Sequence, residues 1–389
     1  MKFDFVILVD SFKPKINSAA VMIEELAKFL SIDSKVCVIT ESNKLKYFYS
    51  FDQITPNFFV LRLKTLKRSK FNIIRGVVEI INPYLMLFIF KLFKFSNTIN
   101  SKKFIWYSPS IFYSPFIKFF KRKNNAKTYL ILRDIFPLWM VDVGLIKKNS
   151  LYHILLKYFE KRQYNLADTI GVQINTNIKI VEDVTNSNSH IHVLNNWKLL
   201  NKNLIKKPIS TPLKSIYAGN IGIAQGEKNF DHIINLASKK NFKISFYSED
   251  KMYKNLVKKF QKLEHISFYE TVTNKKLENI YNDCDFGIVL LDKFHKTHNI
   301  PGKFISYVSN GLPVFCILNN YNPLIDIVNK NYLGIATSDI SDSNLEKCWE
   351  EFEHLIYNND LSLNCHNYAQ ENYDVSSIAK RIKLKFDEL

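Results

Sequence analysis

The sequence of 389 residues has no segment suited to crossing a membrane. Its longest strongly apolar run near a possible span, residues 84–90, is followed by Lys91 and Lys94. That run is far shorter than the ~20 residues that a membrane-spanning helix needs. The opening segment, residues 2–9, carries Asp4 where a secretory signal would be apolar. We therefore expect a first β-strand at residues 3–9, and a protein that is not integral to a membrane.

Cysteine is scarce and shows no pattern. The five cysteines are odd in number, and their spacing is not that of a metal site. Cys37, Cys284 and Cys316 lie in or beside apolar stretches. Free, buried thiols in the reducing cytoplasm are therefore expected, with no disulfide framework and no bound metal.

Acidic residues are short in the first half of the chain only. Residues 1–200 contain 30 Lys and Arg against 14 Asp and Glu, whereas residues 201–389 contain 24 against 22. The basic residues gather with aromatics at 91–95 and 116–123. Such stretches either lie on an anionic membrane, with lysines among the headgroups and aromatics deeper, or form ordinary amphipathic helices. No recognition motif accompanies the charge, so nucleic acid is not an expected partner.

Apolar strand-like runs alternate with helical patterns along the whole chain, which is typical of parallel βαβ units. A polar stretch at 198–212 is the natural linker between two halves. We expect strands at 3–9, 36–40, 104–107, 128–132 and 169–172 in the first half, and at 215–217, 243–247, 266–269, 286–291, 314–317 and 334–336 in the second.

Two glycine-containing turns in the second half point to an anion site. The first places Gly219, Asn220, Gly222 and Gln225 between a strand and a helical pattern. The second begins a helix at Pro301, Gly302 and Lys303 and closes it at Asn310 and Gly311. Backbone N–H groups at helix N-termini stabilise anions such as phosphate. A lysine in the first turn opposes the helix dipole, so Lys303 is better explained by an anion beside it than by a solvated side chain.

The motifs GNIGIAQG, NIPGKFISYVSNGLPV and RDIFPLWMVDVGL resemble the retaining glycosyltransferases of family 4. The nearest likeness is to the N-acetyl-L-fucosamine-type transferases of bacterial O-antigen and capsule assembly, and it covers nearly the whole chain. The resemblance implies a GT-B fold, in which two Rossmann-like doubly wound domains with parallel sheets face a central cleft. Residues 1–200 would bind the acceptor and residues 201–389 the nucleotide-sugar donor, with a C-terminal helix able to pack back on the first domain. It also implies catalysis without a metal or other cofactor.

Carried over by position, the resemblance places the donor diphosphate beside the two turns and the rest of the donor nearby. The implied donor residues are Gly219, Asn220, Gly222, Gln225, Thr271, Val272, His298, Asn299, Gly302, Lys303, Ser306 and Tyr307. Many family members have Arg and Lys in place of Asn220 and Gln225, so Lys303 would carry more of the leaving-group charge. The family's two glutamates, which have seven residues between them, are replaced by His298 and Ser306, so the identity of the donor sugar is left open.

On the acceptor side, Asn17 and Ser18 follow the first strand as candidate acceptor contacts, and either could also cap the next helix. Arg133 and Asp134 follow a later strand and, with Lys303, are the candidate catalytic residues; a structural ion pair is the alternative. His153 and Glu160 are expected on the surface.

The expected activity is transfer, with retention, of a UDP-linked and N-acetylated sugar to a polyprenyl-diphosphate-linked saccharide. Such an enzyme would be cytoplasmic and peripherally associated with the anionic inner leaflet. Two alternatives remain open: a nucleotide-sugar epimerase of the same fold, and an inactive scaffold that binds membrane or nucleic acid.

Overall fold

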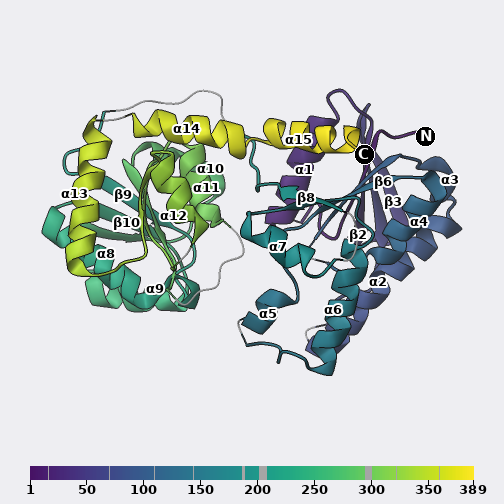
Figure 1. The fold of residues 1–389 in the computed structure, drawn as a ribbon, viewed down its shortest axis with the longest axis horizontal. Helices are drawn as coiled ribbons and strands as arrows, with labels where there is room; N and C mark the ends of the chain where they lie inside the picture. Colours follow the sequence, from purple (N-terminus) through teal and green to yellow (C-terminus); the bar gives the residue numbers. More distant parts are fainter. Residues whose placement is uncertain are drawn as a thin grey trace. The chain divides into compact units, whose positions relative to one another are not determined.

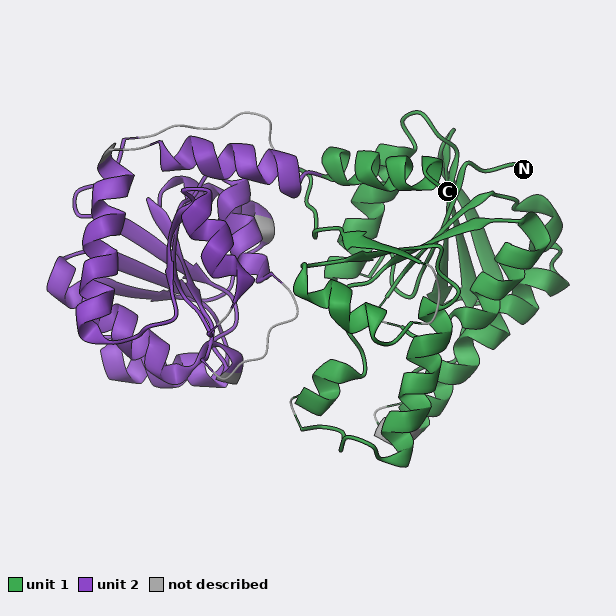
Figure 2. Cartoon of the chain, in the orientation of Figure 1, with its two compact units in different colours: residues 1–199, 375–389 green, residues 200–374 purple. Residues whose placement is uncertain are grey.

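The computed structural model describes the chain except for residues 16, 70, 109, 143, 186–188, 201–207, 294–299, 321 and 359. The chain divides into two compact units (Figure 2). Unit 1 comprises Met1–Leu199 and Val375–Leu389, and unit 2 comprises Leu200–Asp374. Each unit contains one β-sheet with helices on both faces (Figure 1). The last 15 residues thus belong to unit 1, although they follow the whole of unit 2 in the chain.

Unit 1 has an eight-stranded sheet in the order β3-β4-β2-β1-β5-β6-β7-β8. Its strands are β1 (Phe5–Val9), β2 (Val36–Ser42), β3 (Tyr49–Thr55), β4 (Phe58–Lys64), β5 (Lys103–Tyr107), β6 (Lys127–Ile131), β7 (Thr169–Val172) and β8 (His190–Val193). Only β3 pairs antiparallel, through a hairpin with β4. Neither strand of this hairpin was expected from the sequence, and nor was β8. Strand β3 is a polar, largely exposed edge strand without an apolar run, whereas β4 has an apolar run that was overlooked.

The sheet of unit 1 is covered on both faces, as its alternating side chains require. Val6 and Leu8 of β1 face a core cluster that includes α2, α4 and α7, and Phe5 and Ile7 face a second cluster with α1 and α15. The helices of unit 1 are α1 (Ser18–Leu30), α2 (Asn72–Leu92), α3 (Phe95–Thr98), α4 (Ser114–Asn124), α5 (Leu138–Asp142), α6 (Leu151–Tyr164), α7 (Thr176–Glu182) and α15 (Val375–Asp387).

The aromatic side chains of the basic stretch 116–123 face the core. Phe116 and Phe120 on α4 are fully buried, and Phe119 packs partly against the same cluster. The suggestion that these aromatics enter a membrane is therefore wrong; α4 is an ordinary amphipathic helix with outward lysines. The stretch 91–95 is mixed, because Phe95 is buried while Phe93 is exposed.

The C-terminal helix α15 packs beside α1 and closes the second face of the unit 1 sheet. The Phe386 ring lies 5.9 Å from that of Phe5 in an edge-to-face arrangement, and Lys383 forms a 2.7 Å ion pair with Asp33. The backbone N–H of Val375 donates to the carbonyl of Lys198, which joins the returning chain to the end of the first segment.

Unit 2 has a six-stranded, wholly parallel sheet in the order β11-β10-β9-β12-β13-β14. Its strands are β9 (Lys214–Ala218), β10 (Lys243–Tyr247), β11 (Ile266–Tyr269), β12 (Phe286–Leu290), β13 (Val314–Ile317) and β14 (Gly334–Thr337). Its helices are η1 (a 3₁₀ turn, Ile223–Gln225), α8 (Glu227–Lys240), α9 (Lys251–Phe260), α10 (Asn274–Asn282), α11 (Gly302–Ser309), α12 (Pro323–Lys330), α13 (Asp342–Asn358) and α14 (Leu361–Asn372). This is the doubly wound arrangement in which ligands bind beyond the carboxyl ends of the strands.

Candidate functional site

The two glycine-containing turns of unit 2 meet at one edge of its sheet. Gly219 follows β9 with φ +114°, and a Cβ added there would lie 3.2 Å from the Cε atom of Lys303. The Lys303 ammonium donates to the carbonyl of Asn220 at 3.3 Å. Because this φ and this close approach both favour glycine, the first turn is shaped to receive the lysine of the second.

Lys303 is held in a setting that favours an incoming anion. Its Nζ lies 4.5 Å from the centre of the Tyr217 ring. Burial lowers the pKa of Lys303 to about 8, and nearby Asp250 opposes that change. The amine is therefore mostly protonated at pH 7 but incompletely compensated, so a bound diphosphate would stabilise its charged form.

Most backbone N–H groups of the first turn donate hydrogen bonds to acceptors within the protein. Gly219 donates to the carbonyl of Tyr247, Ile221 to the Asp250 carboxylate at 3.0 Å, and Gly222 to the side-chain oxygen of Gln225 at 3.0 Å. Gln225 therefore closes the turn instead of facing a ligand with that oxygen. The N–H groups of Gly219, Ile221 and Gly222 are thus occupied within the protein, and a donor contact at Asn220 stays a proposal.

The N-terminus of α11 is the candidate anion position. Its N-cap residue is Pro301, whose side chain has no polar atom for a capping hydrogen bond. A Cβ added at Gly302 would meet no described atom within 4 Å. The N–H groups of Gly302 and Lys303 belong to the first turn, where an α-helix provides no carbonyl partner. A phosphate at this point would meet both these donors and the Lys303 ammonium.

Tyr307, expected to contact the donor, is instead fully buried. Its hydroxyl accepts from the N–H of Ala218 at 3.0 Å and donates to the carbonyl of Ile216 at 3.3 Å. A Cβ on Gly287 would lie 2.3 Å from the Tyr307 ring, so only glycine leaves room for it. Tyr307 thus fixes α11, and with it Lys303, against β9; its role is positioning.

Of the remaining residues expected to contact the donor, some lie near the edge of the unit 2 sheet and others lie outside the described residues. Thr271 follows β11, and its hydroxyl donates to Glu249 at 2.9 Å, with half-buried Val272 next to it. Ser306 lies one turn after Lys303 on α11, and its carbonyl accepts from Asn310. Both places are at or near the edge that carries the turns. His298 and Asn299 lie outside the described residues.

In unit 1, Asn17 is the N-cap of α1. Its Oδ1 accepts from the N–H of Ala20 at 2.9 Å, and its Nδ2 donates to the Ser11 hydroxyl at 2.8 Å. Ser18, exposed, is the first residue of the helix. The capping role is therefore observed, and an acceptor contact stays a proposal.

Arg133, a candidate catalytic residue, is buried and bound to main-chain oxygens. It donates to the carbonyls of Leu194 at 2.7 Å and Asn195 at 3.3 Å, and it lies 4.9 Å from the Trp197 ring. Burial lowers its pKa to about 10. Direct catalysis by Arg133 is corrected to a structural role, since its guanidinium fixes the chain after β8. Asp134 is half-buried, and burial raises its pKa against the pull of Arg133.

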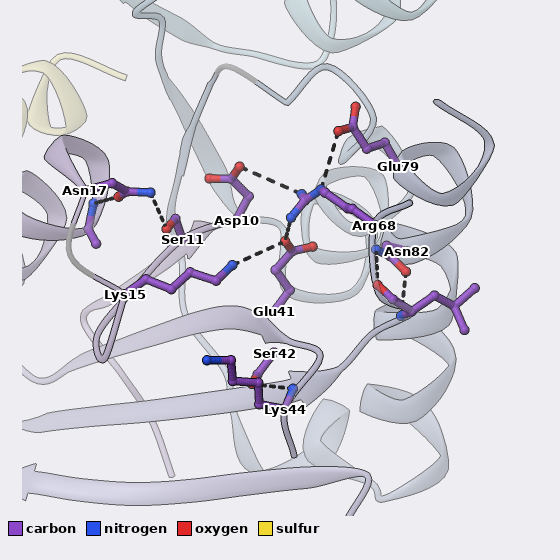
Figure 3. A network of polar contacts seen from close by, with 12 residues as sticks. Asp10, Ser11, Lys15, Asn17, Glu41, Ser42, Lys44, Arg68, Glu79 and Asn82 are labelled. Atoms are coloured by element: carbon purple, nitrogen blue, oxygen red, sulfur yellow. Dashed lines mark hydrogen bonds and ion pairs between the residues drawn. The ribbon is translucent and has the colours of Figure 1, made fainter. Parts of the chain in front are cut away.

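A polar network at the carboxyl edge of the unit 1 sheet was not anticipated (Figure 3). Arg68 binds Glu41 directly and reaches Glu79 at 3.4 Å and Asp10 at 4.0 Å. Burial raises the pKa of Asp10 and of Glu41, and Arg68 opposes both increases. Asp10 directly follows β1 and Glu41 is near the end of β2, so charge at the ends of neighbouring parallel strands was the available signal.

Asp10 and Glu79 are the half-buried acids of this network, with 21% and 29% of their side chains exposed, whereas Glu41 is buried beneath Arg68. Asp10 directly follows β1, at the carboxyl end of that strand. A carboxylate with a raised pKa can accept a hydrogen bond from a sugar hydroxyl or take up its proton. The edge of unit 1 thus carries partly buried acids, whereas the edge of unit 2 carries the Lys303 ammonium.

Glu160 on α6 is buried, not exposed as the sequence suggested. It pairs with Lys157 at 2.5 Å and accepts from the Tyr164 hydroxyl at 3.3 Å. Both partners come from the same helix, so this acid belongs to the structure of α6 and not to either sheet edge.

Comparison with solved structures identifies the fold class as GT-B, the fold of two Rossmann-like domains. Sucrose-phosphate synthase from Thermosynechococcus elongatus is similar over 99% of this chain and 98% of its own, with TM-score 0.69 and 10% identity. A structure described as trehalose-6-phosphate from E. coli, bound with UDP-2-fluoro glucose, gives TM-score 0.66 at 10% identity, over 99% of each chain. The lipopolysaccharide outer core galactosyltransferase WaaB gives 0.63 at 10% identity, over 100% of each chain.

No family model matches the chain, and no curated protein matches it. Identities of 10% establish the fold alone. Among the described residues, no helix is long and apolar enough to cross a membrane, and no group of three or more His, Cys, Asp and Glu side chains could hold a metal ion.

Proposed function

We propose that the protein is a retaining glycosyltransferase that takes its sugar from a nucleoside-diphosphate sugar, UDP-linked and N-acetylated. The observation that carries this proposal is the partly buried Lys303 ammonium at the N-terminus of α11, in contact with the Gly219 turn. One similar structure supports a nucleotide sugar by name, since it holds UDP-2-fluoro glucose, and another is named as a galactosyltransferase.

The chemical role of this position follows from its charge. As the bond between the sugar C1 and the diphosphate oxygen breaks, negative charge develops on the diphosphate. A fixed cation and helix N–H groups stabilise that charge without having to reorganise. The acceptor hydroxyl forms the new C1–O bond on the same face, and its proton passes to the departing diphosphate. No further base and no metal is required, so turnover in the presence of EDTA is part of the proposal.

The proposed acceptor is a polyprenyl-diphosphate-linked saccharide used in bacterial O-antigen or capsule synthesis, at the cytoplasmic face of the inner membrane. Support comes from unit 1: Asp10 offers a hydrogen-bond acceptor for saccharide hydroxyls, with Asn17, Ser18 and Asp134 at the same strand ends. One similar structure is named for a lipopolysaccharide outer core transferase, which is consistent with an acceptor of this kind.

The test is a panel of nucleotide sugars incubated with the purified protein and lipid-linked saccharide acceptors, with EDTA present. The expected result is release of nucleoside diphosphate and an α- or β-linked product that keeps the donor's anomeric configuration. Conversion of the nucleotide sugar to an epimer without release would favour the epimerase alternative. Neither release nor conversion, with no binding of UDP to the protein, would support the inactive scaffold.

A further inference from the structure

Helix α2 carries an apolar face that no described residue covers. Its exposed residues follow one another at intervals of three and four positions, which places them along one side of the helix. They are Ile74 (53% exposed), Val77 (50%), Ile81 (42%), Tyr84 (47%) and Phe88 (61%). The other side of α2 is apolar too and packs into the core through Met86, Ile89 and Phe90. The exposed apolar face of α2 therefore takes no part in the packing of the core.

Helix α6 extends this apolar surface. Leu151, Ile154, Leu155 and Tyr158 are all exposed, Leu151 to 87%. The two helices are neighbours: a Cβ on Gly76 of α2 would lie 3.7 Å from the Tyr152 hydroxyl of α6. Ile80 and Phe159 also pack on one shared cluster, and the helices lie together in Figure 1. We call the exposed residues of α2 and α6 named here the α2–α6 face.

A basic pocket borders the α2–α6 face. It lies between α4 and α6, has a volume of about 380 Å³, and is lined by Lys118, Tyr158, Lys161, Arg162, Asn165 and Leu166. None of the three cations forms an ion pair or hydrogen bond with a described residue. Tyr158 belongs both to the pocket and to the apolar face, so cations and exposed apolar groups are contiguous.

We propose that the α2–α6 face and its basic pocket form the docking surface for an anionic lipid bilayer. Apolar side chains would enter the boundary between headgroups and acyl chains, while the three cations bind lipid phosphates. Unit 1 contains 34 Lys and Arg against 16 Asp and Glu, so a second copy of it would be repelled at close range. This proposal rests on the proposed function and refines it, because a lipid-linked acceptor is held at a membrane surface.

The test measures binding of the full-length protein to vesicles of phosphatidylcholine, with and without phosphatidylglycerol, by co-sedimentation without any nucleotide sugar. Wild type should bind the anionic vesicles more tightly, and binding should weaken as salt rises. In Lys118→Gln/Lys161→Gln/Arg162→Gln, each lost charge should weaken binding about fivefold, giving about 100-fold in all. The matched control removes three exposed lysines of α9 in unit 2, Lys251→Gln/Lys254→Gln/Lys258→Gln, and should bind like wild type.

A second pair of variants tests the apolar part without changing charge. Ile81→Ser/Phe88→Ser should weaken vesicle binding at least tenfold, because both side chains lose apolar area that would leave water. Tyr332→Ser/Leu363→Ser removes two exposed apolar groups from unit 2 and should have no effect. All four substituted positions are exposed, so folding should be retained, as circular dichroism and thermal melting would check.

Three outcomes would overturn the proposal. The first is equal binding of wild type to neutral and anionic vesicles at low salt. The second is a loss of vesicle binding in the unit 2 control variants as large as in the unit 1 variants. The third is a dimer of the wild-type protein in solution that the Ile81→Ser/Phe88→Ser substitutions dissociate into monomers. Vesicle binding requires no catalysis, so it can fail while nucleotide-sugar turnover is observed, or succeed while turnover is absent. The docking proposal and the proposed function are therefore tested separately.

Discussion

The two units share an architecture but differ in the surface that they present. Unit 1 has 34 Lys and Arg against 16 Asp and Glu, and unit 2 has 20 against 20, so the whole net charge of +18 belongs to unit 1. Among the described residues, 25 large hydrophobic side chains are exposed in unit 1 and four in unit 2. An even compositional bias would affect both units alike. The docking proposal accounts for this difference between the two surfaces.

The candidate sites show the reverse of these net charges. The basic unit places acids at the edge of its sheet, where Asp10 and Glu41 flank Arg68. The neutral unit places the Lys303 cation at its edge. Net charge thus sets the long-range electrostatic attraction between a unit and its partners, whereas the chemistry of its site depends on a few partly buried groups. This contrast agrees with the proposed acceptor in unit 1 and the proposed nucleotide-sugar donor in unit 2.

The largest expected effect comes from removing the cation of unit 2. Lys303→Met should lower turnover by about 10²–10³-fold, the usual effect of losing one electrostatic donor. It should not lower the melting temperature, because burial already disfavours the charged amine and lowers its pKa. Steady-state release of nucleoside diphosphate and thermal melting measure the two effects.

Vesicle binding is the control that sharpens the comparison. Lys303→Met should bind anionic vesicles like wild type, because unit 2 is not expected to dock. Undiminished turnover in the folded variant would remove Lys303 from the site and leave unit 2 without an identified anion position.

The next effect concerns the network of unit 1. Arg68→Met should destabilise the protein by about 3 kcal/mol, at the low end for a broken buried pair, because Glu41 is 6% exposed and would lose its nearest cation. Chemical denaturation would measure this loss. Arg68→Met/Glu41→Gln should recover much of it, since the buried charge of Glu41 is then removed together with its cation. An equally unstable double variant would show that Arg68 acts through packing.

Much of the fold could be predicted from the sequence. Parallel strands buried on both faces read as continuous apolar runs, so β1, β12 and β13 were evident. The second turn was equally legible: Pro301 precedes α11, and Asn310 and Gly311 follow it. The polar edge strand β3 could not be recognised, because an edge strand needs no apolar run.

The site was less predictable, because contacts between distant residues depend on packing. Sequence spacing cannot show that Arg68 reaches back to Glu41 and Asp10, or that Tyr307 turns inward to β9. The α2–α6 face was hidden for a related reason. Both sides of α2 are apolar in sequence, and only the fold shows which side is covered.

A glycine comparison tests how each unit is packed. Gly287→Ala should destabilise unit 2 by about 2 kcal/mol, because its Cβ would overlap the Tyr307 ring at 2.3 Å. Gly76→Ala in α2 of unit 1 meets only the Tyr152 hydroxyl at 3.7 Å, and should stabilise the helix by up to about 1 kcal/mol. Differential scanning calorimetry would measure both. Equal changes of the same sign would contradict the close packing of Tyr307 on β12.

The last expected effect is a pH dependence of turnover that depends on Lys303 in unit 2. Lys303 must be protonated to stabilise the diphosphate, and burial places its pKa at about 8 in the free protein. As pH rises through that value the proton is lost, so kcat/KM for the donor should fall about tenfold per pH unit above it. Lys303→Arg keeps its charge at every accessible pH. Its activity should be lower, because the guanidinium has a different shape, but its profile should be flat from pH 7 to about 10. An unchanged wild-type kcat/KM up to about pH 9.5 would mean that the ammonium takes no part, and that the anion position of unit 2 depends on the helix N–H groups alone.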